Sequence, residues 1–153
     1  MDQSHMFDIL AMIHLMVLSL WGGVVATEAV VELYPFRRGE LHTAAIVLHY
    51  WIDLLVELPL VLAVITTGSA LLYLAETITP LHLVKVGFGG AAVAVNLFCI
   101  WVVLRRARSL ARDHNEMQLW KASKIVLACF AGGLVFAAVA ATLGFYLGLQ
   151  RLG

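Results

Sequence analysis

Three ionisable side chains recur at four-residue intervals within one apolar run of the sequence. The run reads 48-LHYWIDLLVELP-59 and carries His49, Asp53 and Glu57. In a helix, residues four apart lie one above the other, so these side chains would form a single stripe. Imidazole and carboxylate groups bind divalent metals and carry protons, so the stripe is a candidate for either chemistry. His42 shares the stripe but lies at the membrane interface, and we leave it out of the site.

A second acidic pair with the same spacing, Glu28 and Glu32, lies in the preceding apolar segment. At about 100° per residue, His14 falls almost on the same line as Glu32, with Glu28 about 40° away. A charged side chain in hydrocarbon costs about 2.5–3.5 kcal/mol, so both stripes must face the interior. We therefore predict a metal site formed by Glu28, Glu32, His49, Asp53 and Glu57. One imidazole with four carboxylates suits iron, manganese or zinc better than copper(I).

His14 and His82 form another candidate group, because they would lie at similar depths on different helices. Two such histidines could hold a haem iron between or beside them. The glycines of 22-GG-23 and 87-GFGG-90 could open the planar slot that a porphyrin needs. Lys85 follows His82 by about one helical turn and could meet a haem propionate or a substrate carboxylate. Two cofactor types therefore remain open, haem b and a non-haem metal ion.

Four membrane-spanning helices are predicted to position these residues. Of the 153 residues, 62% are hydrophobic and only 13% are charged, which is outside the range of ordinary soluble domains. A span needs about 20 predominantly apolar residues. Segments of this kind occupy 9–33, 43–73, 81–104 and 122–148. The predicted fold class is all-α: a single transmembrane four-helix bundle over 1–153, embedded in a lipid bilayer and without a nucleic-acid partner.

Basic residues concentrate in two of the three predicted loops. They are Arg37 and Arg38 after the first span, and Arg105, Arg106, Arg108, Arg112 and Lys121 between the third and fourth spans. Cytoplasmic loops carry most Lys and Arg, so both termini are predicted on the non-cytoplasmic side of what we expect to be a bacterial inner membrane. The small-residue runs at 87–92 and 131–144 favour close helix packing or a homo-oligomer.

Three functions remain open for this arrangement. The first is a redox or electron-transfer protein built around a buried metal, a class that includes membrane oxidoreductases. The second is a subunit of a cation or proton-coupled transporter, in which the stripes form a pathway. The third is an accessory subunit of a larger membrane complex. A purely structural role is the remaining alternative, with the carboxylates protonated or paired with Lys85, Lys124 or arginines.

Parts of the sequence resemble a family of small membrane proteins. The string 14-HLMVLSLWGG-23 is similar to the first helix of the HemJ-type protoporphyrinogen oxidases and the related CopD-like four-helix proteins, in which a His precedes a Trp-x-Gly. The strings 59-PLVLAVITTG-68 and 81-LHLVK-85 resemble their second helix and the start of their third. The resemblance implies that His14 ligates haem b with assistance from Lys85. It also implies oxidation of a porphyrinogen.

Overall fold

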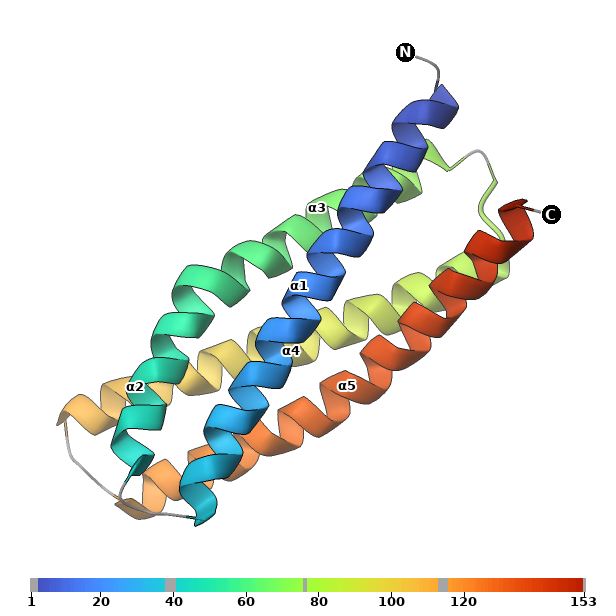
Figure 1. The fold of residues 1–153 in the computed structure, drawn as a ribbon. Helices are drawn as coiled ribbons and strands as arrows, with labels where there is room; N and C mark the ends of the chain where they lie inside the picture. The colour runs from blue at the N-terminus through green and yellow to red at the C-terminus, as the bar shows by residue number, and fades with distance from the viewer. Residues whose placement is uncertain (1–2, 38–40, 76, 113–115, 153) are drawn as a thin grey trace.

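The chain folds into long helices that run up and down (Figure 1). The computed structural model describes residues 3–37, 41–75, 77–112 and 116–152. The elements in order are α1 (Gln3–Arg37), α2 (His42–Ile52), η2 (Asp53–Glu57), α3 (Leu58–Leu74), α4 (Pro80–Arg112) and α5 (Glu116–Leu152). We call the end of the bundle where α1 begins and α5 ends the terminal end, and the opposite end the loop end.

The helices are long and apolar enough to cross a membrane. The candidate spans are His5–Tyr34, His42–Leu74, Pro80–Arg112 and Glu116–Gly148. Large apolar side chains such as Met16, Leu55 and Leu134 are exposed on the outside of the bundle. Soluble proteins rarely expose apolar surface of this extent, whereas lipid-facing helices do so by necessity. The predicted all-α transmembrane four-helix bundle is therefore confirmed.

Only some of the charges that predict the orientation belong to the described residues. Arg38 lies outside them. Arg108 and Arg112 are exposed at the loop end, where the prediction requires basic residues. The fold itself does not test which end faces the cytoplasm, so the non-cytoplasmic location of the termini stays a prediction.

The third span continues further than the sequence predicted, and this changes the position of one arginine. We expected the span to end near residue 104 and the following arginines to lie in a loop, but α4 continues to Arg112. Within this helix Arg105 is exposed, whereas Arg106 is only 2% exposed and lies inside the bundle. The assignment of Arg106 to a loop was wrong. A hydropathy pattern places the end of a span at the first charged residues, although an arginine that is paired with a carboxylate can lie inside the bundle.

The second span changes its hydrogen-bond pattern where the ionisable stripe lies. Over η2 the helix widens into a π-helix, and the Leu58 amide donates to the carbonyl of Asp53. Pro59 follows and has no amide hydrogen, so it cannot make the bond that would restore the α-helical pattern. The irregular turn therefore occupies the ionisable stripe itself. Such turns are frequent at functional sites and redirect the side chains that follow.

Apolar clusters enclose the stripe along the bundle axis. The cluster nearer the terminal end contains Trp21, Val61, Val64 and Ala92. Two further clusters lie beside the stripe and toward the loop end, formed by Cys99, Val102, Val103 and Val126 and by Ile46, Leu110 and Leu119. Among the described residues, none before Trp21, between 65 and 91, or after Val126 is fully buried. The ionisable residues therefore occupy the most tightly packed part of the protein.

Candidate metal centre

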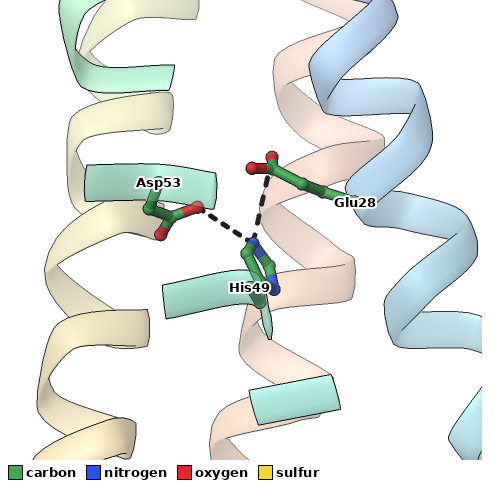
Figure 2. Close-up of side chains that lie close together, drawn as sticks. All are labelled: Glu28, His49 and Asp53. Atoms are coloured by element: carbon green, nitrogen blue, oxygen red, sulfur yellow. Dashed lines mark ion pairs between the residues drawn. The ribbon is translucent and has the colours of Figure 1, made fainter. Parts of the chain in front are cut away.

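The structure brings both predicted stripes into the interior of the bundle. Glu28 and Glu32 come from α1, His49 from α2, and Asp53 and Glu57 from the two ends of η2. None of the five is more than 2% exposed. The π-helical turn keeps Asp53 and Glu57 on the inner side of the second span together with His49. Figure 2 shows Glu28 reaching from α1 toward His49 and Asp53.

Glu28, His49 and Asp53 converge on one point. His49 Nε2 lies 3.2 Å from Asp53 Oδ1 and 3.9 Å from Glu28 Oε2. One ligand atom from each residue lies within 4.8 Å of the other two. Apart from these two ion-pair contacts, His49 Nε2 and all the carboxylate oxygens of Glu28 and Asp53 have no hydrogen-bond partner among the described residues. Buried polar atoms are nearly always hydrogen-bonded, so this group has the features of a ligand site and could hold a divalent metal ion.

Glu32 contacts the other ring nitrogen of His49. The distance from His49 Nδ1 to Glu32 Oε1 is 2.7 Å, and we assign the proton to Nδ1 from this contact. In this tautomer the lone pair of Nε2 is free to bind a cation. Metal-binding histidines commonly donate their second N–H to a carboxylate, which fixes the orientation of the ring. Glu32 therefore acts as a positioning residue for His49, whereas the sequence had grouped it with the ligands.

Arg106 compensates the charge of Glu32. Its Nη1 lies 2.9 Å from Glu32 Oε2, and its Nη2 donates to Glu32 Oε1. This two-point contact is the arrangement in which a guanidinium and a carboxylate bind most strongly. Sequence reasoning missed Arg106 because it stands among several arginines. A signal was available, since Arg106 follows Cys99, Val102 and Val103 at helical spacing and continues their apolar stripe.

Hydrogen bonds continue from Arg106 toward the loop end. Arg106 Nη1 donates to Ser123 Oγ at 2.6 Å, and Ser123 Oγ lies 3.1 Å from His42 Nε2. The His42 ring stacks on Trp120 with the ring centroids 4.2 Å apart. His42, which the prediction leaves out of the metal site, is 9% exposed and belongs to this hydrogen-bonded network. Lys124, a predicted partner of the carboxylates, is exposed instead.

Ser123→Ala is expected to lower the free energy of unfolding by about 1–3 kcal/mol, because two buried groups lose their hydroxyl partner. Those groups are Arg106 Nη1 and His42 Nε2. Thermal unfolding in detergent micelles measures the change. Ser19→Ala is the matched control, since the exposed Ser19 hydroxyl bonds only to its own helix. Equal losses in the two variants would remove Ser123 from the network.

Glu57 is bonded to neutral donors from two other helices. Trp21 Nε1 donates to Glu57 Oε1 at 3.2 Å, and Asn96 Nδ2 donates to the same oxygen at 2.5 Å. A carboxylate accepts hydrogen bonds but does not donate them, so the side-chain NH2 of Asn96 faces Glu57. The carbonyl oxygen of Asn96 has no partner among the described residues. Glu57 thus links α1, η2 and α4 at one level of the bundle.

The residues predicted to bind haem lie toward the terminal end and make separate contacts. His14 is half-buried, with Nδ1 2.7 Å from Thr67 Oγ1. His82 Nδ1 lies 2.8 Å from Thr79 Oγ1 and accepts the Thr79 amide hydrogen at the start of α4. Lys85 is half-buried on the following turn. Within the part of the chain that the structure describes, no hydrogen bond or ring contact joins His14 to His82, so their role as a ligand pair stays a prediction.

The contacts divide the five predicted metal residues by role. Glu28, His49 and Asp53 present ligand atoms that lack hydrogen-bond partners. Glu32 and Glu57 are already bonded to neighbouring donors.

In comparisons with known proteins, no protein-family profile, curated protein or solved structure matches the chain.

Proposed function

We propose that the protein binds a divalent transition-metal ion inside the membrane, with Glu28, His49 and Asp53 as its ligands. The observation that carries the proposal is the convergence of buried ligand atoms without hydrogen-bond partners on one point of the bundle. Arg106 already balances Glu32, whereas no arginine or lysine forms an ion pair with Glu28 or Asp53 among the described residues. A divalent ion would compensate these two carboxylates. Imidazole with carboxylates suits iron, manganese or zinc.

The surroundings of the site favour a resident ion. The apolar cluster around Trp21, Val61 and Val64 closes the side toward the terminal end. The pair formed by Arg106 and Glu32 closes the side toward the loop end. An ion enclosed in this way leaves only when the bundle opens, as expected of a bound cofactor. Iron and manganese change oxidation state at such sites, and we therefore propose a redox or electron-transfer role in a bacterial inner membrane.

The redox role is tested on detergent-purified protein by elemental analysis combined with optical and electron paramagnetic resonance spectra. We expect bound iron or manganese whose spectrum changes between the reduced and oxidised protein. Zinc alone would contradict a redox role and leave metal binding intact. A Soret band would point to haem instead, which is supported here by the resemblance around His14 and Lys85.

Transport is the second candidate, because hydrogen bonds form a polar column between the site and the loop end. The column runs through His49, Glu32, Arg106, Ser123 and His42. Intramembrane columns of ionisable groups often carry protons or cations. The guanidinium of Arg106 opposes passage of a metal cation, which favours the resident metal. Manganese uptake into proteoliposomes, with no metal retained on the purified protein, would reverse this preference.

A further inference from the structure

We propose that a groove on α4 at the loop end, here called the arginine groove, binds the phosphate group of an anionic membrane phospholipid. The groove has a volume of about 470 Å³. The described residues that line it are Trp101, Leu104, Arg105, Arg108, Ser109 and Arg112. None of them belongs to the candidate metal centre, so lipid binding at this groove goes beyond the proposed function and does not depend on it.

The arginine groove begins where α4 leaves the hydrocarbon core of the bilayer. Between Lys85 and Arg105 the sequence has no charged residue. The uncharged run 86–104 is about 29 Å long, because a helix rises about 1.5 Å per residue. This length matches the hydrocarbon core, which is roughly 30 Å thick. Arg105 therefore lies at the boundary of the core, and the following turns with Arg108 and Arg112 lie at the level of the lipid headgroups.

The arginine groove carries positive charge that the described residues do not compensate. Arg105, Arg108 and Arg112 are exposed, and none of them forms an ion pair with a described carboxylate. Their neighbour Arg106 differs, because it is buried in the bundle and paired with Glu32. A guanidinium group binds a phosphate through two parallel hydrogen bonds. The groove is therefore complementary to a phosphate group in both charge and donor type.

An exposed aromatic pair continues the same face of α4 toward the middle of the membrane. The residues on this face recur at intervals of three or four: Phe98, Trp101, Arg105, Arg108 and Arg112. The rings of Phe98 and Trp101 stack with their centroids 5.7 Å apart. Arg105 Cζ lies 5.4 Å from the centroid of the Trp101 ring, an attractive cation–π contact.

This face joins an apolar surface to a cationic one in the order that a phospholipid requires. Exposed Trp101 lies at the depth where tryptophan is enriched in membrane proteins, between the acyl chains and the headgroups. The aromatic pair contacts the apolar part of the lipid, while Arg105 and Arg108 contact its phosphate. A soluble phosphate would use only the cationic half of this surface, so the arrangement favours a lipid.

The test is native mass spectrometry of delipidated protein in detergent, titrated with phosphatidylglycerol or with zwitterionic phosphatidylcholine. We expect the wild type to bind phosphatidylglycerol more tightly than phosphatidylcholine. Arg105→Gln/Arg108→Gln should weaken phosphatidylglycerol binding about tenfold or more, because two basic side chains beside an anionic headgroup together contribute at least that factor. Arg105→Lys/Arg108→Lys keeps the charge and should retain the preference for the anionic lipid. Circular dichroism should show unchanged helicity, since both arginines are exposed.

Lys121→Gln/Lys124→Gln is the matched control, because both lysines are exposed on α5 and do not line the arginine groove. It removes the same charge and should keep the affinity within about twofold of the wild type, since exposed charges outside the groove are largely screened by salt. Equal affinity of the wild type for the two lipids, or equal losses in the two glutamine variants, would overturn the lipid site. Displacement of phosphatidylglycerol by inorganic phosphate would also overturn it. A dimer that Arg105→Gln/Arg108→Gln converts to a monomer without changing lipid binding would assign the face to a second copy of the chain instead.

Discussion

Replacing Arg106 with methionine is expected to destabilise the bundle by about 3–5 kcal/mol, the loss typical of a buried ion pair from which one partner is removed. Arg106 donates to both oxygens of Glu32 and is itself 2% exposed. The variant leaves the Glu32 carboxylate buried with only His49 as a partner. It also removes a donor from Ser123. The free energy of unfolding in detergent, from thermal or denaturant titration, measures the change.

Arg108→Met is the matched control, because Arg108 lies two residues further along α4 and is exposed. A surface change of this kind should stay within about 0.5 kcal/mol of the wild type. The double variant Arg106→Met/Glu32→Gln removes both charges and keeps an acceptor for His49, so it should recover much of the lost stability. If Arg106→Met is as stable as Arg108→Met, the pair does not support the fold.

Asp53→Asn and His49→Ala are expected to reduce the bound metal by more than about tenfold. Substituting a residue that only hydrogen-bonds to a metal ligand already lowers metal affinity by that factor, and these variants change the ligands themselves. Asn keeps the shape of Asp53 but loses the charge that attracts a cation. Ala at position 49 removes the only nitrogen ligand and leaves Glu32 bonded to Arg106. Metal per chain after purification is the readout, and circular dichroism confirms that each variant remains helical.

His14→Ala is the control for this second prediction. His14 contacts Thr67 and has no described bond to the acidic cluster, so its loss should leave the metal content unchanged. Iron lost in His14→Ala but retained in Asp53→Asn would instead locate the cofactor near the terminal end, as the haem hypothesis requires. Unchanged metal in both Asp53→Asn and His49→Ala would remove these residues from the site.

The spans and the inward-facing stripes could be predicted because lipid acts on each segment separately. A membrane helix must be long and apolar, and these properties are readable from composition alone. The high cost of a charge in hydrocarbon then turns helical spacing into a prediction of which residues face inward. Glu28, His49 and Asp53 were identified by these two rules without knowledge of how the helices pack.

The roles within the site could not be predicted, because they depend on contacts between helices. Glu28 and Glu32 occupy equivalent positions on one face of α1, and only the packing of α4 places Arg106 beside Glu32. The hydropathy pattern had assigned Arg106 to a loop outside the membrane. The π-helical turn η2 was also not predicted. Pro59 indicates an interrupted helix, but it does not determine which residues before it form the widened turn.

The central claim, that Glu28, His49 and Asp53 hold a metal ion, is tested most directly by X-ray absorption at the metal edge of purified wild-type protein. We expect only nitrogen and oxygen neighbours in the first coordination shell, with the outer scattering of a single imidazole. The signal should be absent in Asp53→Asn. Sulfur neighbours from the free thiols Cys99 or Cys129, a porphyrin pattern, or no metal above a chelator-treated control would contradict the account.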